Sequence, residues 1–365
     1  MKKKSYILTA CFIATLVLLY ASCSEKQEET PVNVESISFI DVPNDTVKMI
    51  KGDVYKLRIA TNPPNSPVRF YNASSEAFSV KQNTGEITAL KGGAGTVIVI
   101  AQNGDSWTKA YCKVVVTELV EEITVKPYMN IQILSSGTLN VSSYFTALPV
   151  AATNKTLTYA SSNPAVASVD AATGLVKMVS KGVAEITAVS ADGGNVKSEP
   201  VYVYSGYNPT TYSHGSGSTA WIASMSSTYS SSYGASRAID NNTNNFCHWS
   251  EGESHPHYLQ IDFKQALKFN EVQIYRRPNY TDTRDVEIYI IPSTVTTEDD
   301  ITWTDTRYEK WGEISFGDEA SSVTNKAFRK SPGSEVATRY LMLKLPNGNR
   351  YNSQSLAEVI PVYNN

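Results

Sequence analysis

Residues 237–263 read R-A-I-D-N-N-T-N-N-F-C-H-W-S-E-G-E-S-H-P-H-Y-L-Q-I-D-F and join a polar loop to a strand. Residues 240–245 offer many side-chain and main-chain oxygens in one short arc, which is how proteins hold a hard cation such as Ca²⁺. Apolar and polar residues then alternate over 258–263, the period of a half-buried β-strand. The stretch therefore predicts an oxygen-rich loop that leads directly into a sheet.

Three segments around this stretch carry a resemblance to a known family. They are S-R-A-I-D-N-N-T-N-N-F, H-Y-L-Q-I-D-F and F-N-E-V-Q-I-Y-R-R, in this order along the chain. Together they resemble the discoidin domain, also called the coagulation-factor type C domain, whose bacterial relatives include the family-32 carbohydrate-binding modules. The resemblance covers residues 206–365, the size of one domain. It implies a β-sandwich of jelly-roll type, which also suits the expected strands 258–263, 267–275, 286–291, 312–316, 340–345 and 356–363.

The resemblance implies a structural Ca²⁺ in the polar loop, completed by a glutamate near the last strand. The matching positions are Ala238 through its carbonyl, Asp240, Asn242, Asn245 and Glu358. The sequence departs from the family where Asn241 replaces the usual glycine and Asn245 the usual threonine. Asparagine supplies a carbonyl oxygen and tolerates the left-handed conformation, so both changes are compatible with the ion. The alternative is an asparagine-rich loop that is satisfied by its own Asx-turns.

The resemblance also implies sugar contacts from loops at one end of the sandwich. Sugar sites combine flat aromatic surfaces with side chains that hydrogen-bond to hydroxyl groups. The candidate ligand-binding residues are His248, Trp249, Arg276, Arg277, Asn279 and Tyr351. The choice between the two arginines stays open, and Cys247 stands where the family usually has tryptophan. His255 and His257 would also suit a zinc pair, although no third ligand follows at a recognisable spacing.

The chain before this domain contains an internal repeat. Gly85 and Gly93 recur as Gly174 and Gly182 at the same offset, which divides this region into residues 34–118 and 119–205. The segments S-S-E-A-F-S-V-K-Q-N-T-G-E-I and S-S-N-P-A-V-A-S-V-D-A-A-T-G-L-V resemble the bacterial Ig-like domain of group 2. The resemblance implies two tandem β-sandwiches that act as a stalk. Gly85 and Gly174 are expected to take positive φ in a hairpin.

The N-terminal residues have the pattern of an export signal. Three lysines precede an apolar run over 7–20 that is short for a membrane span, and Y-A-S-C ends at Cys23. This resembles a bacterial lipoprotein signal, so residues 1–22 are predicted to be removed, Cys23 lipidated and 23–33 an acidic tether. We expect an outer-membrane lipoprotein that faces the cell exterior. The alternative is an ordinary secretory peptide that is cut near Ala21 or Ser22.

Composition and missing motifs exclude several functions. The formal net charge is −3 and no basic stripe is present, so nucleic acid is not an expected partner. No G-x-S-x-G, G-x-G-x-x-G or P-loop motif occurs, and we predict no enzyme. Cys112 and Cys247 provide no disulfide framework and are expected to be small buried hydrophobic residues.

The sequence thus predicts an all-β chain of two tandem Ig-like β-sandwiches followed by a discoidin-like jelly-roll β-sandwich. The expected function is that of a surface-tethered, non-catalytic lipoprotein that binds a glycan. The alternative is a cell-surface adhesion or assembly subunit that binds a protein partner through its C-terminal domain. Some relatives bind phospholipid through exposed apolar loops, and this sequence has no such loop.

Overall fold

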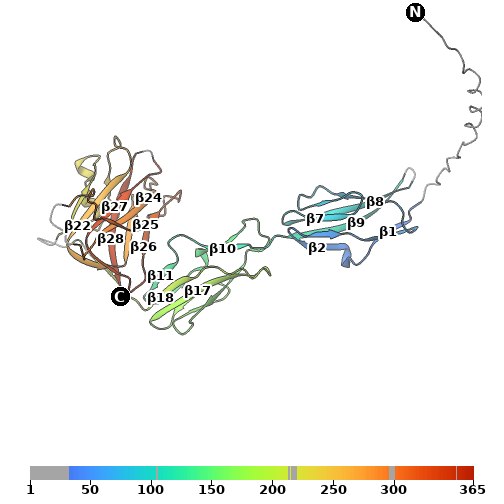
Figure 1. Ribbon diagram of the computed structural model, residues 1–365, viewed down its shortest axis with the longest axis horizontal. Helices are drawn as coiled ribbons and strands as arrows, with labels where there is room; N and C mark the ends of the chain where they lie inside the picture. Colours follow the sequence, from blue (N-terminus) through green and yellow to red (C-terminus); the bar gives the residue numbers. More distant parts are fainter. Residues whose placement is uncertain (1–32, 104–105, 213, 215–219, 296–300, 351) are drawn as a thin grey trace, which may run out of the picture. The chain divides into compact units, whose positions relative to one another are not determined.

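The computed structural model describes residues 33–365 apart from 104–105, 213, 215–219, 296–300 and 351 (Figure 1). Cys23 and Tyr351 therefore lie outside the described residues. The chain divides into two compact units, Met1–Glu118 and Leu119–Asn365. The described residues form β-strands and short 3-10 helices, which confirms the predicted all-β class.

Within the described part of the chain, no helix is both long and apolar enough to cross a bilayer.

The first unit is a sandwich of two main sheets. The larger sheet has the order β2 (Thr46–Ile50), β9 (Ser106–Thr117), β8 (Gly93–Asn103) and β5 (Arg69–Asn72). The smaller sheet has the order β3 (Val54–Lys56), β7 (Glu86–Ala89) and β6 (Phe78–Val80). A separate pair joins β1 (Ser36–Phe39) to β4 (Ile59–Asn62), with the 3-10 helix η1 (Pro43–Asp45) between them. Alternate residues of β8 and β9 are buried, so the core lies between the sheets.

Residues 119–205 repeat this plan. The larger sheet has the order β11 (Ile131–Leu134), β18 (Val201–Ser205), β17 (Gly182–Ser190) and β14 (Leu157–Ser161). The smaller sheet has the order β12 (Thr138–Asn140), β16 (Leu175–Met178) and β15 (Ala167–Val169). A third pair joins β10 (Glu122–Val125) to β13 (Phe145–Leu148), which follows the 3-10 helix η2 (Ser142–Tyr144). In both domains the first strand of the larger sheet pairs in parallel with the last, as β2 with β9 and β11 with β18.

The repeated glycines have the conformation that the sequence predicts. Gly85 and Gly174 each have φ of 69°. A Cβ at Gly85 would lie 2.7 Å from the ring of Phe70, and a Cβ at Gly174 would lie 3.1 Å from the main-chain nitrogen of Ser142. Each glycine therefore combines a left-handed turn with close packing, Gly85 against a ring of the opposite sheet and Gly174 against the 3-10 helix η2.

The C-terminal domain is a sandwich of two five-stranded sheets. One has the order β20 (Ile222–Met225), β22 (His257–Phe269), β27 (Val336–Leu345), β24 (Asp285–Pro292) and β25 (Glu309–Ser315). The other contains β19 (Pro209–Thr211), β28 (Ser355–Asn364), β23 (Glu271–Arg276) and β26 (Asn325–Arg329), and β21 (Cys247–His248) also pairs with β28. The inward faces of both sheets form one apolar core. Cys112 and Cys247, each in its own domain, are free and buried as expected.

One expected strand is wrong. Residues 267–275 do not form a single strand, because the chain leaves β22 at Phe269 and enters the opposite sheet as β23 at Glu271. The buried Asn270 makes this corner, where its Oδ1 accepts a hydrogen bond of 2.9 Å from the main-chain nitrogen of Asn364. An asparagine that satisfies main-chain groups in this way supports a sharp change of sheet.

Candidate ligand-binding end of the C-terminal domain

The polar loop follows the 3-10 helix η5 (Ala235–Ala238) and folds on its own side chains. Oδ1 of Asp240 accepts a hydrogen bond of 3.1 Å from the main-chain nitrogen of Asn242, whose Oδ1 accepts one of 3.0 Å from that of Asn244. Asn241 takes the left-handed conformation with φ of 58°. The Asx-turns of the alternative interpretation are therefore present, and asparagine serves where the family has glycine.

Glu358 reaches this loop from β28. Its Oε2 accepts a hydrogen bond of 3.0 Å from the main-chain nitrogen of Asn242. Burial raises the pKa of Glu358 to about 7, and the negative charge of Asp240 acts in the same direction. Asp240 in turn accepts a hydrogen bond of 2.7 Å from Nδ2 of Asn245. The structure thus brings both predicted carboxylates and both predicted amides to one place, beside the buried Ala238.

An oxygen atom in this loop remains without a partner. Oδ1 of Asn245 is buried and makes no hydrogen bond to any described residue. A buried, unsatisfied oxygen next to two carboxylates suits a hard cation, which prefers oxygen ligands. Among the described residues, no group of three or more His, Cys, Asp and Glu side chains could hold a metal ion, so this set depends on amide and main-chain oxygens.

In the histidine pair considered for zinc, one ring nitrogen of each residue lies at hydrogen-bond distance from another protein group. The rings of His255 and His257 lie 4.8 Å apart. Nε2 of His257 lies 3.0 Å from the carbonyl oxygen of Asn352, and Nδ1 of His255 lies 3.3 Å from Nε2 of Gln354. Both histidines are thus directed at the segment that precedes β28.

Two predicted ligand contacts are corrected by the structure. The side chain of Trp249 is fully buried, stacks on His257 with ring centroids 5.7 Å apart, and donates from Nε1 to the carbonyl oxygen of Tyr258 at 3.2 Å. Arg276 is also fully buried, because the alternation of β23 directs it inward. Its Nη2 donates to the carbonyl oxygen of Glu319 at 3.1 Å and also to that of Ala320. Neither side chain offers a surface to a ligand.

The neighbouring Arg277 lies at the end of the sandwich instead. Its guanidinium carbon lies 3.5 Å from the ring centroid of Tyr280 and 4.3 Å from that of Phe246. Pro278 and Asn279 form the turn that makes this contact possible, since Asn279 has φ of 63° and the nitrogen of Tyr280 donates to the carbonyl oxygen of Arg277 at 3.4 Å. The turn leaves Asn279 exposed and 41% of Tyr280 accessible to solvent.

His248 lies beside this group, at the start of the pairing between β21 and β28. Its side chain is buried, with 6% of the residue exposed, and Nδ1 lies 2.7 Å from Oγ of Ser355. Nε2 lies 3.4 Å from Oγ of Ser353 and 3.9 Å from a carboxylate oxygen of Glu251. Burial lowers the pKa of His248, which favours a neutral ring at neutral pH.

Two further tyrosines complete an aromatic cluster that the sequence interpretation missed. The ring of Tyr229 is 56% exposed and its centroid lies 5.2 Å from that of His248. Tyr233 in the 3-10 helix η4 (Ser231–Tyr233) stacks on Phe246 with centroids 5.1 Å apart. The sequence signal was the presence of two tyrosines in a serine-rich loop. Large rings in such a loop indicate that they pack together or contact a ligand. We use "aromatic end" for Tyr229, Tyr233, Phe246, His248, Arg277 and Tyr280.

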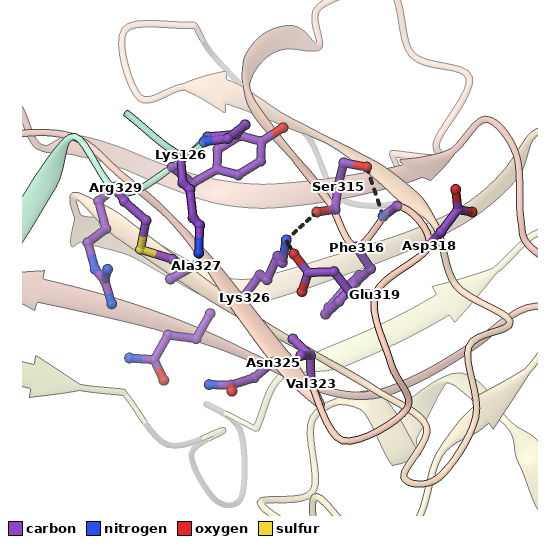
Figure 2. A pocket seen from close by; sticks show the side chains of 15 residues that line it. Lys126, Ser315, Phe316, Asp318, Glu319, Val323, Asn325, Lys326, Ala327 and Arg329 are labelled. Atoms are coloured by element: carbon purple, nitrogen blue, oxygen red, sulfur yellow. Dashed lines mark hydrogen bonds and ion pairs between the residues drawn. The ribbon is translucent and has the colours of Figure 1, made fainter. Parts of the chain in front are cut away.

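A separate hollow of about 660 Å³ lies within the unit Leu119–Asn365 and is shown in Figure 2. Residues 126–129 line it together with residues of β26 and the segment after β25. Lys326 in this hollow donates to Oε1 of Glu319 at 2.7 Å and to the carbonyl oxygen of Ser315 at 2.7 Å. Arg329 lies 2.8 Å from Oε2 of Glu271. Because these two cations already have partners, we assign no ligand to this hollow.

Family models match two parts of the chain. Residues 222–359 match the F5/8 type C domain, and residues 119–201 match the bacterial Ig-like domain of group 2. The chain therefore carries a domain of each of these families, as the sequence predicts. No curated protein matches the chain.

Solved structures to which the chain is similar include a family 32 carbohydrate-binding module, a chitosan-binding module and a domain of a chitobiase. The family 32 module of C. perfringens NanJ in complex with galactose is 18% identical with a TM-score of 0.34, and the match covers 42% of this chain and 99% of that one. The C-terminal domain of a chitobiase from Bacteroides fragilis is 18% identical with a TM-score of 0.32, covering 43% and 98%. Chitosan-binding module 2 of a Paenibacillus chitosanase/glucanase, in complex with chitotriose, is 14% identical with a TM-score of 0.31, covering 39% and 95%.

Proposed function

We propose that this protein is a surface-tethered, non-catalytic lipoprotein whose C-terminal domain binds a glycan at the aromatic end. The observation that supports this most directly is the stack of the Arg277 guanidinium on the ring of Tyr280, a residue that is 41% exposed. The match to the F5/8 type C domain adds to the proposal, because the bacterial relatives of that domain include family-32 carbohydrate-binding modules. The two Ig-like domains serve as the stalk.

The residues of the aromatic end match the chemistry of a sugar. Tyr280 and Tyr229 present flat apolar rings on which the C–H face of a pyranose can stack. Arg277 donates hydrogen bonds in a fixed fork, so it can bind two neighbouring hydroxyl groups, and Asn279 adds an exposed amide. One shallow site of this kind binds with about −4 to −8 kcal/mol, in the millimolar to micromolar range. Many tethered copies on one surface would raise capture by avidity.

The polar loop is proposed to hold a structural Ca²⁺. Asp240, Asn242, Asn245 and Glu358 would supply side-chain oxygens, and Ala238 its carbonyl. The fit rests on the unsatisfied Oδ1 of Asn245 and on the raised pKa of Glu358. The bound ion would neutralise the two carboxylates, and the loop would then fix Phe246 and the start of β21.

Attachment to the outer membrane remains a proposal that rests on the N-terminal sequence. Lipidation of Cys23 would place the protein in the membrane fraction and, at the cell surface, make it accessible to added protease. Cys23→Ala should move it to the soluble fraction of the cells. Recovery of this variant in the membrane fraction would contradict lipid anchoring through this cysteine.

The glycan is sought with a chain that starts at Ser24, on a glycan array followed by calorimetry. Arg277→Ala and Tyr280→Ala should each weaken binding at least tenfold, which corresponds to about 1.4 kcal/mol. Tyr111→Ala is the matched control, because it removes a ring that is 58% exposed in the first unit. Binding that survives both variants would refute the site. A chain that binds no glycan but captures a protein through its C-terminal domain would favour the adhesion alternative.

A further inference from the structure

A buried chain of three polar side chains lies behind the aromatic end. Oγ of Ser355 donates a hydrogen bond of 2.7 Å to Oδ2 of Asp282, and the same oxygen lies 2.7 Å from Nδ1 of His248. Asp282 is 1% exposed and Ser355 is fully buried, so no solvent competes for these bonds. The three residues come from the segment before β24, the start of β28 and β21.

The number of available protons limits how the hydrogen bonds between these three side chains can be directed. A serine hydroxyl carries one proton, and an ionised carboxylate can only accept. When Asp282 is ionised, Ser355 gives its proton to Asp282 and can only accept from the histidine. The ring proton of a neutral His248 must then lie on Nδ1, which leaves the electron pair on Nε2 as an acceptor, 3.4 Å from Oγ of Ser353.

The hydrogen bonds of Asp282 suit an ionised carboxylate, because Oδ1 accepts one of 3.1 Å from the main-chain nitrogen of Thr283 and Oδ2 accepts one of 2.7 Å from Ser355. Burial lowers the pKa of His248, the positive charge of Arg277 lowers it further, and Asp282 and Glu251 act in the opposite direction. Burial raises the pKa of Asp282, while the hydrogen bond from Ser355 and the charge of Arg277 oppose that effect. Asp282 also interacts electrostatically with the buried Arg276. Burial thus acts against the ionised form of Asp282, and the charge of Arg277 and the two hydrogen bonds that its oxygens accept act for it.

We propose that Asp282 and Ser355 are positioning residues that hold His248 in the tautomer with the proton on Nδ1, so that Nε2 faces the ligand as a hydrogen-bond acceptor. His248 then takes a hydrogen bond from a ligand hydroxyl, and Arg277 gives one to the same or the next oxygen. This consequence rests on the proposed function and selects neutral ligands with neighbouring hydroxyl groups. The tautomer itself can be tested without any ligand.

The test is a ¹⁵N spectrum of the histidine rings at pH 7.5, on the chain that starts at Ser24. His257 is an internal standard, because its Nε2 lies 3.0 Å from the carbonyl oxygen of Asn352 and must carry the proton there. We expect the two buried histidines to show opposite tautomers. A proton on Nε2 of His248 in the unmodified protein would overturn the proposal, whatever any variant does.

Asp282→Asn tests the cause of the tautomer. The main-chain nitrogen of Thr283 donates to Oδ1 of Asp282 at 3.1 Å, so the amide oxygen of the variant should stay there and its NH₂ group should face Ser355. The hydrogen-bond direction then reverses, and the proton of His248 should move to Nε2 while His257 is unchanged. Ser355→Ala, which removes the connection, should leave His248 in a mixture of tautomers. A His248 that keeps its proton on Nδ1 in a folded Asp282→Asn or Ser355→Ala variant would contradict the proposal.

The spectra and the binding measurements test the tautomer of His248 and the proposed glycan binding separately. If the spectra show the expected tautomers and no glycan binds, the proposed function fails and the positioning role stands. If a glycan binds, Asp282→Asn should weaken it at least tenfold, because the ligand hydroxyl would meet a donor. Binding that is unchanged in that variant would refute the role of Nε2 as the acceptor.

Discussion

The group 2 Ig-like domain and the F5/8 type C domain are both β-sandwiches, but they bury different kinds of side chain. Within residues 119–205 the buried polar side chains are Gln132, Ser190, Ser198 and Ser205. The described part of the C-terminal domain buries many more, and several of them are ionisable: Asp262, Glu271, Arg276, Asp282 and Glu358. Burying a charged group is unfavourable unless it is paired and hydrogen-bonded.

The two domains differ in what their buried side chains do: those of the Ig-like domain pack, and several of those in the C-terminal domain form polar networks. Apolar alternation and tight turns are enough to hold an Ig-like stalk together. In the C-terminal domain, Asp282 accepts a hydrogen bond from the buried Ser355 behind the aromatic end, and Glu358 accepts one from the main chain of the exposed Asn242 in the polar loop. Networks of this kind stabilise a fold less than an apolar core does, and a binding site is a reason to keep them.

The largest effect is expected from Trp249→Ala. The indole is fully buried against His257, so its loss should destabilise the C-terminal domain by about 3–5 kcal/mol. Thermal or denaturant unfolding measures this, with the transition of the first unit as the internal reference. Tyr280→Ala, at an exposed position of the same end, should change stability by no more than about 0.5 kcal/mol. A Trp249→Ala domain of unchanged stability that has lost its ligand would restore Trp249 as a contact residue.

The two neighbouring arginines show which part of the site could be predicted from the sequence. Arg276 follows the apolar Val272 and Ile274 with a period of two, so alternation would have placed it in the interior, where the structure has all three side chains. That signal was available and decides between the arginines. The position of Trp249 was not predictable in this way, because it follows the two-residue strand β21 and has no period to read.

Long-range contacts explain what the sequence could not reveal. The order of the segments and the family resemblance were enough to predict the sandwich and to group Asp240 with Glu358. The contact between Asp282 and Ser355 joins residues 73 positions apart, and neither residue belongs to a recognisable motif. Such a pair is defined by packing of two sheets, which a single sequence does not specify at the level of one hydroxyl group.

Glu358→Gln should remove a pH dependence of stability that we expect in the C-terminal domain and not in the Ig-like domains. Folding raises the pKa of Glu358 from 4.5 to about 7, so the folded state without a cation binds the proton more tightly than the unfolded state. The stability from this proton is complete below pH 4.5 and is lost as pH rises through 7. In a chelator, the wild-type C-terminal domain should therefore lose roughly 1–3 kcal/mol between pH 5 and 8, and Glu358→Gln should not.

Added Ca²⁺ provides the converse measurement. It should raise the melting temperature of the wild-type domain more at pH 8 than at pH 6, because at the lower pH the ion must displace a proton from Glu358. Glu358→Gln should show little Ca²⁺ effect at either pH. A pH-independent Ca²⁺ effect that persists in the variant would place the ion elsewhere, and the Ig-like domains are expected to be unaffected throughout.

The smallest effect concerns the Ig-like side of the comparison, where turns rather than polar networks determine stability. Gly137 and Gly174 have similar positive φ of 76° and 69°, but a Cβ at Gly137 meets nothing within 4 Å, whereas one at Gly174 meets main chain at 3.1 Å. Gly137→Ala should therefore cost about 1 kcal/mol from backbone strain alone. Gly174→Ala should cost about 1 kcal/mol more, because Ser142 and Tyr159 must also move. Denaturant unfolding measures both variants. Equal losses would mean that the turn conformation is the sole requirement at Gly174.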